Sequence, residues 1–113
     1  MLINFKDMEE TAHEHFKGGE GTFINKVFHD SDNKILTGRL TPGSSIGLHT
    51  HQGNSEIIFI LSGNGKVLYD GAYETVSAGS CHYCPQGHSH SLINDGTEDL
   101  VICAVVPEHG AAR

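Results

Sequence analysis

From residue 22 onward the sequence alternates between short β-rich runs and clusters of turn-forming residues, and this alternation limits the fold more than any other feature. Turn signals recur at intervals of about eight to twelve residues, as they do in all-β domains. Because no stretch beyond residue 21 has a sustained helical period with caps, the spacing predicts a sandwich or a barrel. We expect strands at residues 22–29, 34–41, 46–49, 55–62, 66–69, 73–76, 81–84, 90–93 and 100–106.

Glycine is unusually frequent, with 14 in 113 residues, and it supports the same interpretation. Glycine disfavours helix interiors and adopts the positive φ angles that tight turns require. The segments Gly53-Asn54, Asp70-Gly71 and Asn94-Asp95-Gly96 are typical of turns between antiparallel strands. We therefore expect several tight hairpins.

Length and charge restrict the domain organisation and the partners. A chain of 113 residues is long enough for one hydrophobic core, whereas two domains would each be smaller than most domains that fold alone. Fourteen acidic and seven basic residues give a formal net charge of −7, which would repel nucleic acids and anionic membranes. We expect a single domain with a small-molecule ligand, no nucleic-acid partner and no membrane partner.

The cysteines and the first residues of the chain bear on its compartment. The first ten residues become acidic without the apolar run of a signal peptide, and no run approaches the ~20 apolar residues of a membrane helix. Three cysteines are an odd number, and Cys81 and Cys84 would face opposite sides of one strand. We expect a cytoplasmic protein without disulfides.

The nine histidines outnumber the lysines and arginines, and two of them form the pair His49-Thr-His51. Residues two apart in a strand point to the same face, so both imidazoles would reach one ion. The turn at residues 53–54 would bring the chain back antiparallel and place Glu56 opposite the pair. An apolar floor beneath this cluster would come from Ile58 and Ile60.

A further candidate ligand, His90, lies far along the chain, after a Pro-x-Gly turn. It shares strand parity with Leu92, so its ring would point into the same apolar interior. Three imidazoles and one carboxylate suit a divalent transition metal such as Fe, Mn, Ni, Co or Zn, with coordination positions left open for a ligand. The sequence thus predicts one divalent metal ion per chain, bound by His49, His51, Glu56 and His90.

In these segments the sequence resembles the cupin superfamily. Residues 43–63 match its first motif, G-x5-H-x-H-x(3,4)-E-x6-G, and residues 79–94 match its second, G-x5-P-x-G-x2-H-x3-N, at every fixed position. Agreement at all of these positions argues against the alternative that the four polar residues are ordinary strand residues on a solvated face.

The resemblance implies a small antiparallel jelly-roll β-barrel, with residues 21–113 as the single barrel domain and the same four residues as its metal ligands. It also implies a homodimer. Residues 1–20 would then be a short N-terminal extension that can exchange a strand between protomers. Within this extension we expect a short strand near residues 2–5 and a solvated loop at residues 13–17, which contains His13 and His15.

Three more side chains are candidates for ligand contact or proton transfer, namely His88, Tyr69 and Tyr83. His88 shares strand parity with His90, although the adjacent turn could break that register. The alternative for the two tyrosines is a structural role at a strand end or at the barrel mouth. Phe59 alternates to the opposite face of its strand from the carboxylate ligand and should pack behind it.

A metal ion with open positions inside an apolar barrel favours an enzyme that acts on a small, oxygen-rich anion such as a keto acid, carboxylate or sugar acid. The fold alone does not choose among dioxygenase, decarboxylase and isomerase chemistry. Cysteine-dioxygenase-like cupins replace the motif glutamate, which this chain keeps as Glu56. Between His51 and Glu56 no acidic residue matches the lid carboxylate of oxalate-decarboxylase-like cupins. The alternatives are a non-catalytic binding or storage protein with a structural metal, and a metal-free interaction domain.

Overall fold

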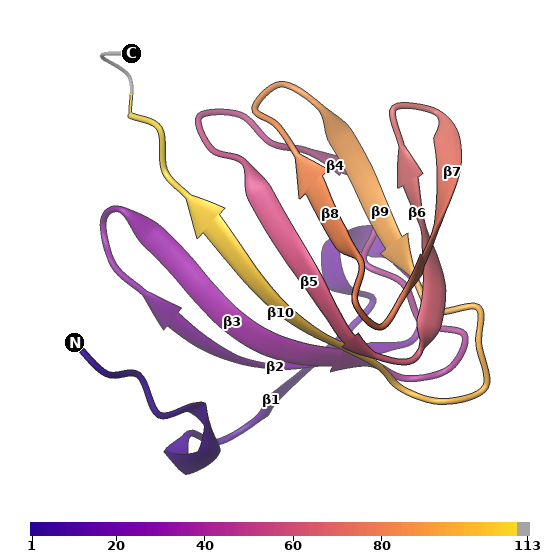
Figure 1. The fold of residues 1–113 in the computed structure, drawn as a ribbon, viewed down its shortest axis with the longest axis horizontal. Helices are drawn as coiled ribbons and strands as arrows, with labels where there is room; N and C mark the ends of the chain where they lie inside the picture. The colour runs from indigo at the N-terminus through magenta and orange to yellow at the C-terminus, as the bar shows by residue number, and fades with distance from the viewer. Residues whose placement is uncertain (111–113) are drawn as a thin grey trace.

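The computed structural model describes residues 1–110, which fold into two antiparallel sheets enclosing one core (Figure 1). Within these residues, regular structure consists of η1 (Phe5–Asp7), β1 (Thr11–Glu14), η2 (Phe16–Gly18), β2 (Thr22–His29), β3 (Asn33–Leu40), β4 (His49–Thr50), β5 (Glu56–Ser62), β6 (Asn64–Tyr69), β7 (Ala72–Ser77), β8 (Cys81–Cys84), β9 (Ser89–Ile93) and β10 (Leu100–Pro107). The expected all-β antiparallel jelly roll is confirmed. Among the described residues no helix is both long enough and apolar enough to cross a membrane.

The strand order explains how the barrel closes. The larger sheet has the order β1-β2-β3-β10-β5-β8, and the smaller sheet has the order β4-β9-β6-β7. After β3 the chain repeatedly crosses from one sheet to the other, so segments distant in sequence become neighbours. This crossing is typical of a jelly roll and brings residues from both sheets to one interior.

Alternation along the strands builds that interior. In β10 every second side chain is buried, and the strands beside it contribute the matching inward positions. The expected inward direction of Ile58 and Ile60 is confirmed, because these side chains are 1% and 2% exposed and belong to the core. Phe59 points outward and is 46% exposed, so the expectation that it packs behind the site is wrong.

Two predicted turns have different outcomes. Asp70 and Gly71 both have positive φ angles, of 48° and 85°, and they join β6 to β7 as a tight hairpin, as predicted. Gly53 also has a positive φ angle, but the turn at residues 53–54 does not form a hairpin between neighbouring strands. It carries the chain from β4 in the smaller sheet to β5 in the larger sheet, so the predicted antiparallel return beside β4 is wrong.

The N-terminal residues differ from the sequence-based expectation. Residues 5–7 form a 3-10 turn instead of ending a strand, and β1 covers residues 11–14, so its last two residues fall in the loop predicted at residues 13–17. His13 is half-buried because its ring packs against Phe16, and its Nε2 lies 3.1 Å from Oδ1 of Asn25. β1 pairs with β2 of its own chain, and strand exchange between protomers stays a prediction.

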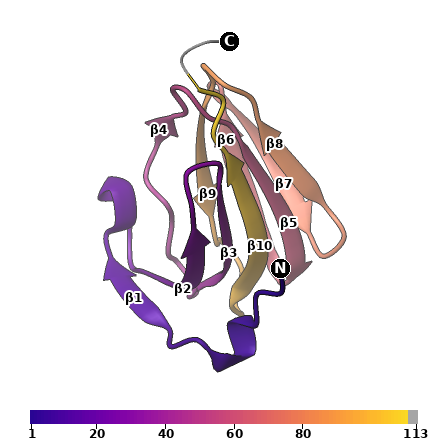
Figure 2. The ribbon, with the colours of Figure 1, turned by 90° about the vertical axis from the view of Figure 1, so that its left-hand side faces the viewer.

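The segment after β1 is joined closely to the stretch that leads into the first histidine pair (Figure 2). The backbone N–H of Gly47 donates to the carbonyl oxygen of Phe16 at 3.0 Å. A Cβ atom on Gly47 would collide with the backbone of Lys17 and lie 2.7 Å from the nitrogen of Gly19. This contact replaces most of the strand predicted at residues 46–49, and only His49 and Thr50 form β4.

Candidate metal centre

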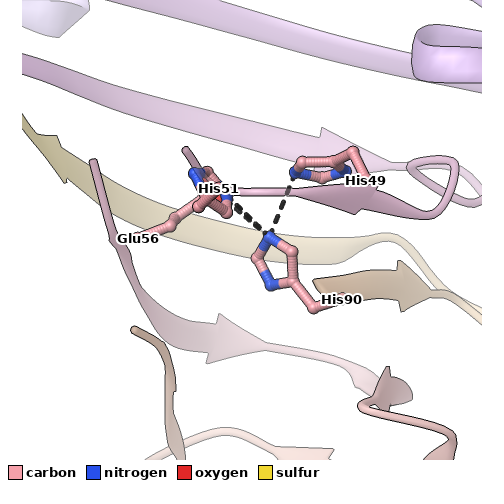
Figure 3. A group of neighbouring side chains, drawn as sticks. All are labelled: His49, His51, Glu56 and His90. Carbon is pink, nitrogen blue, oxygen red and sulfur yellow. Dashed lines mark hydrogen bonds and ion pairs between the residues drawn. The ribbon is translucent and has the colours of Figure 1, made fainter. Parts of the chain in front are cut away.

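The four predicted ligands come from both sheets. His49 lies in β4 and is the direct strand partner of His90 in β9, within the smaller sheet. His51 follows β4, and Glu56 begins β5 in the larger sheet. Figure 3 shows the three rings and the carboxylate turned toward one another. The sequence predicted this set, although the structure brings Glu56 to it across the barrel and not along a hairpin.

The distances among the donor atoms fit a single ion. Nε2 of His90 lies 3.1 Å from Nε2 of His49, 3.0 Å from Nε2 of His51 and 3.0 Å from Oε1 of Glu56. Nε2 of His51 lies 3.2 Å from the same carboxylate oxygen, and all four donor atoms lie within 4.8 Å of one another. Two donors that each lie about 2.1 Å from a shared ion, at right angles, are about 3.0 Å apart.

The other nitrogen of each ring is already held. Nδ1 of His49 donates to the carbonyl oxygen of Gly47 at 2.7 Å, and Nδ1 of His51 lies 2.7 Å from Oδ1 of Asn54. Because a carbonyl oxygen only accepts, the hydrogen of a neutral His49 ring sits on Nδ1 and its Nε2 presents a lone pair. Ring lone pairs and a carboxylate that converge in this way are stabilised by a cation bound between them. The arrangement therefore fits a metal-binding site.

Burial and mutual contact set the charges of these groups in the metal-free protein. Burial alone would raise the pKa of Glu56, but the adjacent rings of His51 and His90 lower it to about 2. Burial lowers the pKa of His49 to about 4, so that ring is neutral at pH 7. The carboxylate raises the pKa of His51, which makes this ring a site where a proton competes with a metal.

A cavity of about 280 Å³ lies beside this cluster. Three of the four candidate ligands form part of its wall, namely His49, His51 and Glu56. Much of the remaining lining is apolar and includes Phe23, Leu36 and Ile102. Lys17 and Lys34 also line the cavity. The arrangement can therefore bind a small molecule that touches both a metal and a positive charge.

The three candidates for proton transfer lie elsewhere. His88 is half-exposed, and its Nδ1 lies 2.5 Å from Oδ2 of Asp70 and 3.2 Å from the hydroxyl of Tyr69. Tyr83 is 54% exposed, on the outer side of β8. Among the described residues the cavity lining includes none of the three. Their predicted roles stay predictions, and this placement gives them no direct contact with a molecule in the cavity.

Sequence reasoning missed several residues that shape the centre. His82 is 4% exposed and lies behind His90, while Asn54 and Gly47 hold the other two rings. The alternation of buried and exposed residues in β8 would have placed His82 inward. The sequence did not show that Lys17 lines the cavity, because its segment reaches the barrel through backbone contacts with residues distant in the chain.

Comparison with known proteins agrees with this geometry. Residues 36–106 match the family model described as Cupin domain. A protein of Thermotoga maritima named Oxalate-binding protein is 30% identical over 112 residues, which cover 94% of this chain and 93% of that protein.

Solved structures show the same fold. A crystal structure described as a predicted oxalate decarboxylase from Thermotoga maritima has a TM-score of 0.90 at 29% identity, covering 96% of this chain and 99% of that chain. A cupin-2 domain from Rhodospirillum rubrum has a TM-score of 0.77 at 16% identity and covers 95% of this chain and 74% of that chain, which shows a shared fold alone. The match to the family model spans most of the chain and includes all four candidate ligands, so this protein belongs to the cupin family.

Proposed function

We propose that this protein holds a divalent transition-metal ion in its barrel and acts, as a metal-dependent enzyme, on a small oxygen-rich carboxylate that binds to the ion. The observation that carries the proposal is the convergence of three imidazoles and one carboxylate beside a cavity whose lining includes His49, His51, Glu56 and two lysines. Fe, Mn, Ni, Co and Zn all suit this donor set.

The charge of the cavity supports an anionic ligand. The chain carries a formal net charge of −7 and has only seven lysines and arginines. Two of those seven, Lys17 and Lys34, line the cavity, and Glu56 is the single acidic residue among the described lining residues. Since Glu56 faces the histidine cluster, the lysines leave the remainder of the cavity positive.

The relatives support oxalate as the first carboxylate to test. The similar protein from Thermotoga maritima is named Oxalate-binding protein, and the similar crystal structure is described as a predicted oxalate decarboxylase. Oxalate is small enough for the cavity and carries two carboxylates on adjacent carbons, so it can offer two oxygens to one ion. Keto acids share this adjacent pair of oxygens.

The bound ion and the residues around the cavity would have different roles in binding the ligand. A bound ion would act as a Lewis acid that polarises the carboxylate or carbonyl of the ligand. Gly47 and Asn54 orient the rings of His49 and His51 before any ligand arrives. The apolar part of the wall would pack against the carbon atoms of the ligand, and Lys34 would attract its negative charge.

A second candidate is a non-catalytic protein that binds or stores the same ligand. Apart from the metal-binding set itself, the described residues of the cavity lining include no carboxyl and no imidazole that could act as a general acid or base. The name of the Thermotoga maritima relative, which states binding alone, favours the same candidate.

Calorimetric titration of oxalate into Mn(II)-loaded, Co(II)-loaded and metal-free protein tests the proposal. We expect binding to the loaded forms alone, and weaker binding of succinate, whose carboxylates are too far apart to chelate well. Lys34→Gln should weaken oxalate binding by about fivefold, the effect of one partly exposed charge. Equal binding to loaded and metal-free protein would refute the role of the metal.

Product analysis separates the enzyme from the binding protein. The loaded protein is incubated with oxalate, keto acids and sugar acids, and each substrate is followed by NMR. Consumption that disappears in His90→Ala, while that variant keeps the β-sheet circular dichroism of the wild type, supports an enzyme. Tight binding without any consumption supports the second candidate.

We also propose that the protein is a homodimer that associates through the outer face of β5, β8 and β10. Phe59, Leu61 and Tyr83 on this face are 46%, 54% and 54% exposed. The strand partners of Phe59 and Tyr83 are uncharged, so two copies with a net charge of −7 would meet with little repulsion here. Light scattering over a dilution series should give twice the chain mass, and Phe59→Glu should give the monomer. A wild-type monomer throughout would refute the proposal.

A further inference from the structure

Behind the candidate metal centre, two more side chains continue the line of contacts away from His90. Nδ1 of His90 lies 3.0 Å from Nε2 of His82, and Nδ1 of His82 lies 3.4 Å from Oε1 of Glu74. His90 and His82 are 1% and 4% exposed, whereas the side chain of Glu74 is 53% exposed. The line therefore runs from the buried centre to the solvent.

This line uses a different part of the barrel from the cavity. His82 lies in β8 and Glu74 lies in β7, which are edge strands of the larger and smaller sheets. None of His90, His82 and Glu74 is among the residues that line the cavity. The side chains thus approach the centre between two sheet edges, without contact with a molecule bound in the cavity.

The hydrogen positions along the line follow from one assumption, that Nε2 of His90 binds the ion. The single ring hydrogen of neutral His90 then sits on Nδ1 and is donated to Nε2 of His82. Since that atom accepts, the hydrogen of neutral His82 sits on its own Nδ1, which faces the carboxylate of Glu74. The N–H of His90 thus has an acceptor in His82, and the N–H of His82 has a carboxylate oxygen 3.4 Å away.

The partner of His90 differs from those of the other two imidazoles. His49 and His51 are held by neutral oxygens, of Gly47 and Asn54 respectively. His90 is held by a ring that is itself in contact with a carboxylate. A negative charge at the end of such a line makes the metal-bound imidazole a stronger donor, and it also fixes the tautomer and the ring orientation.

We propose that His82 and Glu74 are positioning residues for the metal ligand His90, setting the orientation of its ring and strengthening its Nε2 as a donor to the ion. The proposal rests on the metal site of the proposed function, but not on any substrate or reaction. The ring planes of the two histidines differ by 29° and their centroids lie 5.2 Å apart, an arrangement that suits a hydrogen bond between the ring edges and supports a fixed geometry.

Substitutions at His82 distinguish positioning from simple filling of space. His82→Leu fills the same space with an apolar side chain of similar size, which cannot accept the hydrogen of His90. His82→Gln offers an amide oxygen to His90 and an N–H to the carboxylate. Co(II) is the probe: its affinity is measured by competition with a chelator, and its visible absorption spectrum reports the geometry of the donors around it.

We expect His82→Leu to weaken Co(II) binding by about 10- to 100-fold and to change the spectrum, as loss of an outer hydrogen bond to a ligand does. His82→Gln should recover most of the affinity. Glu74→Gln should weaken binding by about two- to fivefold, because the carboxylate is half-exposed. Glu98→Gln, an exposed site that removes the same charge, is the matched control and should bind Co(II) like the wild type.

Wild-type affinity and an unchanged spectrum in His82→Leu would overturn the proposal. If His82→Leu does not fold, Glu74→Gln decides, because its surface position should not disturb folding. An unchanged Glu74→Gln, or one matched by Glu98→Gln, would then overturn the proposal. The outcome is separable from that of the proposed function: a wild-type protein that binds Co(II) but no carboxylate refutes the function, while these variants still test the positioning.

Discussion

Asn94 ends the second sequence motif, yet its side chain contacts backbone groups and not the metal centre. It is fully buried, its Nδ2 donates to the carbonyl oxygens of Leu40 and Glu98 at 2.8 Å each, and its Oδ1 accepts from the N–H of Gly96 at 3.0 Å. The bond to Leu40 ties the end of β9 to the end of β3, and the bonds to Glu98 and Gly96 hold the loop between β9 and β10.

Replacing Asn94 with alanine removes all three hydrogen bonds at once. A net loss of about 1 kcal/mol for each bond, with an added cost for polar groups left buried, gives about 2–4 kcal/mol. Such a loss is a large part of the ~5–15 kcal/mol by which a domain of this kind is stable. The melting temperature should fall by roughly 10 °C.

Urea denaturation of the metal-free protein, followed by circular dichroism, measures this loss without a contribution from bound metal. Asn64, whose side chain is exposed, provides the matched control, and Asn64→Ala should change the free energy of unfolding by less than about 0.5 kcal/mol. Asn94→Asp should be no more stable than Asn94→Ala, because a carboxylate oxygen would face two carbonyl oxygens.

The reasoning is refuted if Asn94→Ala loses less than about 0.5 kcal/mol, the range of ordinary surface substitutions. It is also refuted if Asn94→Asp keeps the stability of the wild type. The folded Asn94→Ala protein should still bind Co(II), since the four candidate ligands are intact.

Acidification should release the metal. The contact with Glu56 raises the pKa of His51 above the ordinary value of histidine, so protons should begin to compete with the metal, and the affinity to fall, while the pH is still above that ordinary value. Unchanged Co(II) binding at pH 4.5 would contradict this competition. Gly47→Ala should lower the free energy of unfolding and weaken Co(II) binding, because its Cβ would collide with the backbone of Lys17. Denaturation and chelator competition measure the two effects, and a stable variant with normal affinity would argue against a role of this close contact in the site. Glu10→Ala should leave the midpoint of urea denaturation nearly unchanged, because the ion pair with Arg39 is exposed, and a clear drop in the midpoint would show a structural role.

The cluster of four candidate ligands was predictable because the two motifs carry these residues at fixed spacings, and the strand parity of His49 and His51 agrees with a shared face. The path by which Glu56 reaches the histidines was not predictable from the local pattern. A turn with positive φ at Gly53 is compatible both with a hairpin and with a crossing between sheets. The choice depends on which strands pair, and β5 pairs with β8 and β10, whose sequences lie far away.

Local patterns also failed where packing between distant segments decides the outcome. Phe59 was correctly placed on the opposite face of its strand from Glu56, but nothing in its own segment shows whether that face is covered. His82 sits in a run whose alternation is clear, yet its partner His90 becomes its neighbour only when two sheets close on each other. Burial of His13 similarly depends on Phe16 folding back onto the barrel.

The division of the ligands between the two sheets has a mechanical consequence. His49 and His90 belong to the smaller sheet and Glu56 to the larger one, so an ion held by all three would cross-link the two sheets. Binding to the native state alone raises the free energy of unfolding in proportion to the logarithm of the free metal concentration. The concentration of free metal would thus set the stability of the closed barrel as well as the occupancy of the site.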